Sequence, residues 1–258
     1  MSDKMKIKVF SCIMLTLLFL CACRTQSVYA KEKITVGTNA EYAPFEYLDS
    51  DGNLTGFDYE LLEAIAQEEN LELEWKDMPF DSLVGSMETG NIQIIAAAIG
   101  PTKEREKSVD FSDVYYTGSQ SIVSSQKTPL YDFAELSGKR VAVLEGSQSD
   151  FIVSGENTDY GVVENATVVR FKNAASAVME LKNGGVNAVL IDTIMAEIYC
   201  RQNDDIVYQK VDGTEEDTVY CIEKGNTEII AEMIAQETNA DLFKIEPVED
   251  YPVTYDEC

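Results

Sequence analysis

The sequence predicts an α/β fold of two lobes, with the second lobe inserted into the first. Short apolar runs such as Ile92–Ile99 and Val141–Leu144 alternate with helix-like segments along the chain. This alternation is typical of parallel sheets with helical crossovers. A late apolar run, Thr218–Ile222, indicates that the chain returns to the first lobe. Links near Gly118 and Gly213 would then join the lobes as a two-strand hinge.

The expected elements alternate in both lobes, on the evidence of apolar runs for strands and spaced apolar residues for helices. In the first lobe, strands are predicted over Ile34–Asn39, Leu71–Trp75 and Ile92–Ile99, with helices from Asp58 to Ile65 and from Phe80 to near Gly90. In the second, strands are predicted over Thr117–Val123, Val141–Leu144, Thr167–Phe171, Val186–Ile191 and Ile206–Val211, with helices over Asn173–Lys182 and Thr193–Gln202. Asp58 is expected to cap its helix, and Asp212–Asp217 is expected to be a polar link.

Length and composition limit the functions that the chain can have. Its 258 residues, 45% of them hydrophobic, suffice for one large or two small globular domains. A formal net charge of -26 argues against binding to nucleic acid or to an anionic membrane face. The sequence contains no histidine, the commonest general base and metal ligand. We therefore expect neither a triad hydrolase nor a His-ligated metal site, and we predict no cofactor.

The N-terminal residues 1–30 are typical of an export segment with a short leash. Lysines precede the apolar run Val9–Leu20, which is short for a membrane span. The run leads into Ala22-Cys23, which is similar to a bacterial lipobox. We expect a lipoprotein at the cell surface or in the periplasm, tethered to the membrane by a lipid on Cys23. Signal-peptide cleavage near Ala30, giving a plain secreted protein, is the alternative.

The cysteines do not form a disulfide framework. Three of the six lie in the export segment, which leaves Cys200, Cys221 and Cys258. An odd number means that at least one of these is unpaired within the chain. A disulfide between Cys200 and Cys221 is possible in an oxidising compartment, but the spacing alone does not establish it.

The stretch Ile92–Arg105 predicts a corner that can bind a carboxylate. Its strand ends at Gly100, where the backbone can approach a ligand, and Pro101 suits the first position of a helix. Free N–H groups at such a turn favour an anion. The guanidinium of Arg105, one turn later, can hold a carboxylate with two hydrogen bonds. The same residues also fit an ordinary strand, turn and helix with an exposed arginine.

Six motifs occur in a specific order along the chain: Val36–Phe45, Gly56–Glu60, Ile92–Arg105, Val109–Ser112, Val141–Ser147 and Ala188–Asp192. Together they resemble the extracellular solute-binding proteins, family 3, of polar-amino-acid ABC importers. The resemblance extends from Ile34 to about Thr227. It implies a two-lobe periplasmic-binding-protein-like type II fold, with lobe 2 inserted in lobe 1 and a two-strand hinge. The implied boundaries are 31–118 for the first part of lobe 1, 119–212 for lobe 2 and 213–238 for the return to lobe 1.

The resemblance implies a role for each candidate site residue. Arg105 would hold the α-carboxylate of an amino acid, helped by backbone N–H groups near Gly100, Ser147 and Gln148. Asp192 would accept the α-ammonium, and Phe80 with Tyr42 or Phe45 would wall the side-chain pocket. Two alternatives remain open from the residues themselves. Asp192 could be the N-cap of the helix that follows it, and Phe45 could pack in the core.

The chain departs from the family at three site positions. Many relatives carry an acid where Asn39 stands, and Ser or Gly where Ala97 and Ala98 stand. The α-ammonium would then depend more on backbone carbonyls and on Asp192. Asn39 and Ala98 stay in the predicted site, but these losses of polar contacts argue against a strongly basic ligand such as arginine.

The C-terminal residues 239–258 form an atypical tail, since relatives end with a long helix that here begins near Gly225. The tail resembles a fragment of a flavodoxin. FMN binding is not expected, because Ile222, Glu223 and Lys224 stand where a phosphate loop needs small hydroxyl residues. A fused or frameshifted gene end is one hypothesis for this tail, and natural drift is the other.

The function that the resemblance implies is that of a monomeric substrate-binding lipoprotein of an amino-acid ABC importer. It would capture a polar amino acid between its lobes and deliver it to the permease and ATPase subunits, without catalysis. One alternative is a periplasmic dehydratase-like enzyme on the same scaffold, which needs a pocket carboxylate as acid or base. Glu41 and Glu145 are its candidates. The other alternative is a non-functional fused or truncated gene product.

Overall fold

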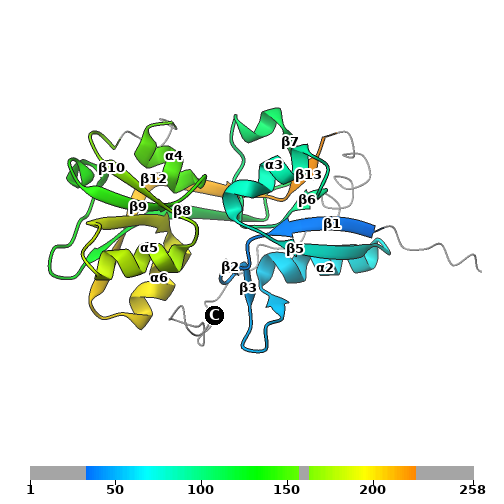
Figure 1. The fold of residues 1–258 in the computed structure, drawn as a ribbon, viewed down its shortest axis with the longest axis horizontal. Helices are drawn as coiled ribbons and strands as arrows, with labels where there is room; N and C mark the ends of the chain where they lie inside the picture. The colour runs from blue at the N-terminus through cyan, green and yellow to red at the C-terminus, as the bar shows by residue number, and fades with distance from the viewer. Residues whose placement is uncertain (1–32, 157–162, 225–258) are drawn as a thin grey trace, which may run out of the picture. The chain divides into compact units, whose positions relative to one another are not determined.

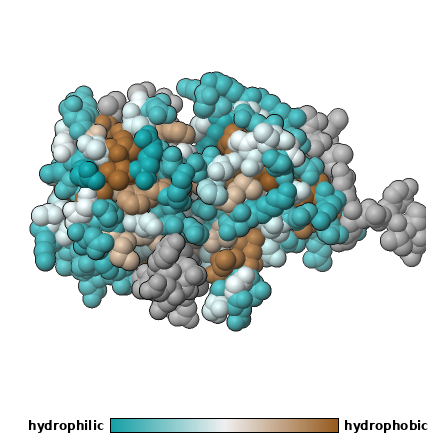
Figure 2. All heavy atoms as spheres, viewed as in Figure 1, coloured by the Kyte–Doolittle hydropathy of each residue, from teal (hydrophilic) through white to brown (hydrophobic). Residues whose placement is uncertain are grey.

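A computed structural model describes residues 33–156 and 163–224 (Figure 1). The predicted export segment with Cys23, the helix expected from Gly225 and the flavodoxin-like tail of 239–258 lie outside the described residues. Within the described ranges, no helix has the length and apolar character needed to cross a membrane. The face shown in Figure 2 is mostly hydrophilic, with separate hydrophobic patches, in keeping with the acidic composition.

Lobe 1 is built on a five-stranded sheet with the order β5-β1-β6-β13-β7. Its strands are β1 (Lys33–Thr38), β5 (Glu72–Asp77), β6 (Ile94–Ile95), β7 (Val109–Phe111) and β13 (Cys221–Glu223). Strands β5, β1 and β6 are parallel, and β13 runs antiparallel to both of its neighbours. A small antiparallel sheet of β2 (Glu41–Tyr42), β3 (Glu46–Leu48) and β4 (Leu54–Thr55) completes the lobe.

Alternation along β6 explains why helices cover both faces of this sheet. Ile94 packs in a core with Leu62 and Ile65 of α2 (Phe57–Glu68). Its neighbour Ile95 packs in another core with Leu83 of α3 (Leu83–Glu88), which follows a 3-10 turn at Phe80–Ser82. Successive side chains of a strand point to opposite faces, so a run of apolar residues is buried on both.

Lobe 2 repeats this plan with a sheet in the order β10-β9-β11-β8-β12. Its strands are β8 (Tyr116–Ser125), β9 (Arg140–Leu144), β10 (Thr167–Phe171), β11 (Ala188–Asp192) and β12 (Ile206–Thr218). The helices are α4 (Gln148–Ser154), α5 (Ala174–Lys182) and α6 (Thr193–Gln202), with a 3-10 turn at Phe133–Leu136. Figure 1 shows α5 and α6 on one side of this sheet and α4 on the other, and the two separate cores agree with that placement.

The chain crosses between the sheets twice, from β7 to β8 and from β12 back to β13. This confirms the expected two-lobe α/β fold with the second lobe inserted in the first. The exact boundaries at 118/119 and 212/213 stay predictions, because both positions lie within the long strands β8 and β12 rather than at their ends.

The polar link expected over Asp212–Asp217 is wrong, since β12 continues to Thr218 and pairs with β8. The register shifts between Lys210 and Glu215, around Gly213 with its φ of 76°. Beyond the shift the pattern alternates: Thr214 and Thr218 are buried, whereas Glu215 is exposed. The many charged residues of this segment indicated a link, although its buried and exposed side chains alternate as in a strand.

Two expectations for lobe 1 are also wrong. Asp58 does not cap α2, which begins one residue earlier with Gly56 at its N-cap, and its carboxylate bonds to distant groups instead. No α-helix follows Pro101, where only a short 3-10 turn forms at Arg105–Lys107. The hydroxyl of Thr102 accepts the Arg105 N–H at 3.1 Å and closes a local turn that competes with a helix.

The possible disulfide between Cys200 and Cys221 does not form, and both thiols are free. Cys200 lies on α6 of lobe 2, whereas Cys221 lies on β13 of lobe 1 and is fully buried. The two cysteines therefore belong to different lobes, whereas a disulfide requires that their Cα atoms lie close together.

Gly56 supports a testable prediction about lobe 1. Its φ of 119° is unfavourable for other residues, and an added Cβ would lie 2.3 Å from the carbonyl oxygen of Phe45. Gly52 also has a positive φ, of 79°, but an added Cβ there meets open space. We expect Gly56→Ala to lower the free energy of unfolding by several kcal/mol, well beyond the roughly 1 kcal/mol expected for Gly52→Ala. Denaturant unfolding of both variants measures the difference, and equal losses would contradict this account.

Candidate functional site

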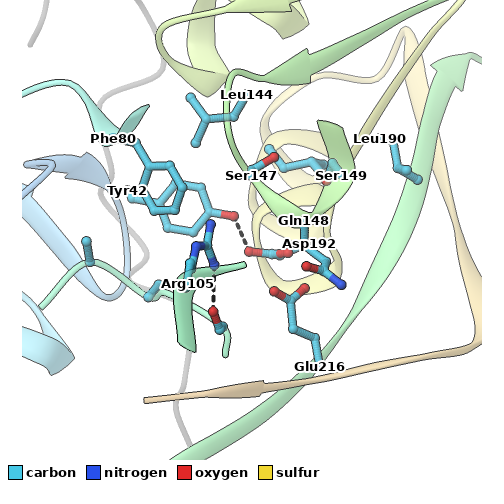
Figure 3. A pocket seen from close by; sticks show the side chains of 14 residues that line it. Tyr42, Phe80, Arg105, Leu144, Ser147, Gln148, Ser149, Leu190, Asp192 and Glu216 are labelled. Atoms are coloured by element: carbon cyan, nitrogen blue, oxygen red, sulfur yellow. Dashed lines mark hydrogen bonds between the residues drawn. The ribbon is translucent and has the colours of Figure 1, made fainter. Parts of the chain in front are cut away.

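A small pocket lies where the two lobes meet, lined by loops and strand ends of both (Figure 3). It is lined by Tyr42, Phe80, Ala97, Ala98, Gly100, Arg105, Leu144, Ser147, Gln148, Ser149, Leu190, Ile191, Asp192 and Glu216. Its volume of about 30 Å³ is room for one or two waters. An amino acid therefore fits only if the lobes move apart.

Arg105 is the cation of this pocket and is almost fully buried, with 7% of its surface exposed. Its guanidinium donates to the carbonyl oxygen of Gly100 in lobe 1 and, at 2.9 Å, to that of Gly146 in lobe 2. The rings of Phe80 and Phe151 lie 5.5 and 5.8 Å from the guanidinium carbon. Burial lowers the pKa of Arg105, but an arginine stays charged at neutral pH. The alternative in which Arg105 is an exposed arginine after an ordinary turn is therefore wrong.

Asp192, at the carboxyl end of β11, faces Arg105 from lobe 2. It is the N-cap residue of α6, yet its carboxylate makes no capping bond. It accepts instead the hydroxyl of Tyr42, from lobe 1, and the side-chain amide of Gln120. Burial raises the pKa of Asp192, and these two hydrogen bonds oppose the rise. Asp192 thus occupies the N-cap position that the alternative expected, but its side chain does not cap the helix, and the carboxylate points into the pocket.

Glu216 also lines the pocket, and the sequence analysis missed it because it fell in the supposed polar link. Its carboxylate points toward that of Asp192 (Figure 3) and accepts the amide of Gln120 at 2.8 Å. Burial, followed by the charge of Asp192, raises the pKa of Glu216 to about 8, against the opposing charge of Arg105. The alternation of Thr214, Glu216 and Thr218 could have placed this side chain on the inner face of β12.

The start of α4 supplies the third side of the pocket. The Ser147 hydroxyl accepts the N–H of Asp150, so Ser147 is the N-cap of the helix. Ser147, Gln148 and Ser149 all line the pocket. Ser149 donates at 2.6 Å to the amide oxygen of Gln120, which leaves the Gln120 nitrogen facing the two carboxylates.

Eight of the ten predicted binding residues line this pocket: Tyr42, Phe80, Ala98, Gly100, Arg105, Ser147, Gln148 and Asp192. The other two, Asn39 and Phe45, do not line it. Asn39 is buried and donates to the carbonyl oxygen of Met78 at 3.2 Å. Phe45 lines an adjoining smaller cavity and packs against Phe57 and Tyr116, with ring centroids 6.5 and 5.2 Å away.

A larger hollow of about 580 Å³ lies over α5 and α6. Its lining is mostly apolar or neutral, with Glu180 and Lys182 as its charged residues. It lacks the convergence of several buried polar groups that marks a small-molecule site. The pocket of Arg105 and Asp192 is therefore the candidate functional site.

Comparison with known proteins agrees with this architecture. Residues 34–242 match the family model "Bacterial extracellular solute-binding proteins, family 3". The chain is 35% identical over 198 residues to the arginine-binding extracellular protein ArtP of Bacillus subtilis, covering 77% of this chain and 76% of that protein. It is 34% identical over 209 residues to a probable histidine-binding protein of Campylobacter jejuni, covering 77% and 78%.

A solved structure, holo ArgBP from T. maritima, aligns with a TM-score of 0.73 at 33% identity. The alignment covers 80% of this chain and 89% of that one. These relatives are binding proteins by name. From the family match, the identities and the shared fold, the chain belongs to the bacterial extracellular solute-binding proteins of family 3.

Proposed function

We propose that the chain captures an amino acid between its lobes and delivers it to an ABC importer. The observation that carries this proposal is the opposition of two buried charges across one pocket. Arg105 of lobe 1 offers a planar donor fork for an α-carboxylate. Asp192 of lobe 2 offers an acceptor for an α-ammonium. A zwitterion that meets both groups links the lobes and favours the closed form.

The preferred ligand in this proposal carries an extra positive charge, as arginine does. Relatives named for arginine and histidine support this choice. The neutral side chains of Asn39, Ala97 and Ala98 favour a less basic ligand, so L-arginine and L-glutamine are the two ligands to compare.

A set of contacts across the pocket rim would hold the closed form. Lys172 of lobe 2 lies 2.7 Å from Asp81 of lobe 1 and 2.9 Å from Glu145 of its own lobe. Deeper in, Tyr42 bonds to Asp192 across the lobes. We name the three residues Asp81, Glu145 and Lys172 the rim latch. Opening about the paired strands β8 and β12 would break it.

The partners follow from the family and complete the proposal. The chain would be exported, tethered by a lipid on Cys23, and would act as a monomer that docks on permease subunits. We also propose that it binds without turnover. Neither Glu41 nor Glu145, the candidate acid–base groups of the dehydratase-like alternative, lines the pocket, and Glu145 is held by Lys172. Glu216 does line it, and in this proposal its role is to bind the ligand.

Replacing Arg105 tests the binding function. We expect Arg105→Lys to weaken the binding of L-arginine roughly 10- to 100-fold, because an ammonium cannot reproduce the two-bond fork. Calorimetric titration gives the affinities. Arg140→Lys is the matched control, since Arg140 also donates to a backbone carbonyl, that of Gly185, but on the surface. Loss of binding in both variants, or in neither, would contradict the role of Arg105.

The rim latch gives a second test, by kinetics. We expect Lys172→Ala to speed the dissociation of L-arginine by up to about fivefold, as for other exposed ion pairs. Dissociation from the wild type should also quicken with added salt, more steeply than from the variant. Stopped-flow fluorescence measures both. Lys182→Ala is the control, because its partner Asp205 lies in the same lobe at 3.6 Å. Equal rates in wild type and Lys172→Ala would exclude the latch.

A further inference from the structure

Two carboxylates share one hydrogen-bond donor at the back of the pocket. The side-chain nitrogen of Gln120 donates to Asp192 and, at 2.8 Å, to Glu216. Ser149 fixes this amide by donating to its oxygen. Two ionised carboxylates that accept hydrogen bonds from the same amide repel each other, and burial away from water makes this repulsion stronger. The arrangement is stabilised if a cation or a proton stands between them.

Among residues 33–156 and 163–224, Tyr42 and Gln120 donate hydrogen bonds to these two carboxylates, and neither is a cation. The guanidinium of Arg105 donates to the carbonyl oxygens of Gly100 and Gly146 instead. The Glu216 carboxylate nevertheless lies directly beside Gly100, because a Cβ added to Gly100 would be 2.5 Å from an oxygen of this carboxylate. The carboxylate therefore stands beside the part of the pocket where the charged head of an amino acid would bind.

The neighbouring cavity points to the same spot. Both the main pocket and the smaller cavity toward β8 are lined by Ala98, Asp192 and Glu216. These residues therefore form the junction of the two spaces. Of the aromatic walls of the main pocket, Phe80 lies away from Glu216 in Figure 3. Glu216 thus faces the head of a bound amino acid rather than its side chain.

We propose that Glu216 is a second acceptor for the α-ammonium of the ligand, which it shares with Asp192 across Gln120. This inference rests on the proposed amino-acid binding function. An ammonium group has three donors, and the side chains of Ala97 and Ala98 offer it no acceptor. A carboxylate on β12 supplies the acceptor that these alanines lack. Because every α-amino acid carries this ammonium, Glu216 contributes to binding whatever the ligand side chain is.

A consequence is that binding releases a proton. Asp192 and Asp217 raise the pKa of Glu216 alongside burial, while Arg105 and Gln120 lower it, to a result of about 8. Tyr42 also faces this group, and burial holds its own pKa well above the usual range, so it stays neutral. At neutral pH Glu216 is therefore largely protonated, and an arriving ammonium drives the proton off. Affinity should rise with pH up to about 8, by at most about tenfold per pH unit.

The test is calorimetric titration of the whole chain with L-arginine and with L-glutamine. At about pH 7, titrations in two buffers of different ionisation enthalpy give the number of protons released. We expect up to one proton from the wild type and fewer from Glu216→Gln. At about pH 8, we expect Glu216→Gln to weaken both ligands by a similar factor of roughly 10 or more. Glu215→Gln, on the exposed face of the same strand, should change neither result.

Several outcomes would overturn the proposal. Unchanged affinity in Glu216→Gln would do so, and so would a loss confined to L-arginine, which would assign Glu216 to the ligand side chain. The 2-hydroxy analogue of arginine, which has no α-ammonium, should lose much less than arginine on this substitution. The wild type alone gives an independent test, since binding without proton release at pH 7 contradicts the proposal even if the variant fails to fold. If the wild type binds no amino acid, the proposed function fails instead.

Discussion

The geometry of lobe 1 depends on the hydrogen bonds of one buried residue, Asp58. It accepts the backbone N–H of Ala98 at 2.8 Å and the hydroxyl of Tyr115 at 2.7 Å, while Tyr220 donates to the Asp58 carbonyl oxygen at 3.1 Å. Ala98 has a left-handed φ of 45°, which a residue with a Cβ adopts only when its surroundings hold it there. Tyr115 and Tyr220 lie beside the two chain crossings. Asp58 thus ties the Ala98 loop to both connections between the lobes, through its carboxylate to Tyr115 and through its backbone carbonyl to Tyr220.

The same region gathers more carboxyl groups than cationic side chains. Burial raises the pKa of Asp58 to about 6, and it holds that of Glu46 well above its usual range. Neither carboxylate oxygen of Glu46 has a hydrogen-bond partner among the described residues. Asp192 and Glu216 add two further acids, and Arg105 is the only cationic side chain among the described residues that line the pocket. Such a cluster would favour a positively charged group of the ligand and would make binding depend on pH.

Much of this arrangement could be predicted from the sequence, because its signals are local. Apolar runs gave the strands of both sheets, and helix α6 was predicted over Thr193–Gln202, the range observed. Arg105 was predicted from its place after a strand and a Gly-Pro turn, whereas the role of Asp192 came from the resemblance to the family. The role of Asp58 was not predictable in this way, since its partner Tyr115 lies 57 residues away. Glu216 was missed because charged residues concealed the strand in which it alternates. A short segment of sequence does not reveal contacts between distant parts of the chain. It also does not reveal a strand whose residues are mostly charged.

The described pocket explains why a complete zwitterion is the ligand that fits it best. Arg105 is satisfied by the carbonyl oxygen of Gly146, and Asp192 by the hydroxyl of Tyr42, both from the opposite lobe. Ligand binding is therefore an exchange of hydrogen bonds, and its free energy is a difference between similar terms. A carboxylate alone would replace the bonds of Arg105 but leave Asp192 with Tyr42. An amino acid would replace both sets with charged partners at once, and would itself link Arg105 of lobe 1 to Asp192 of lobe 2.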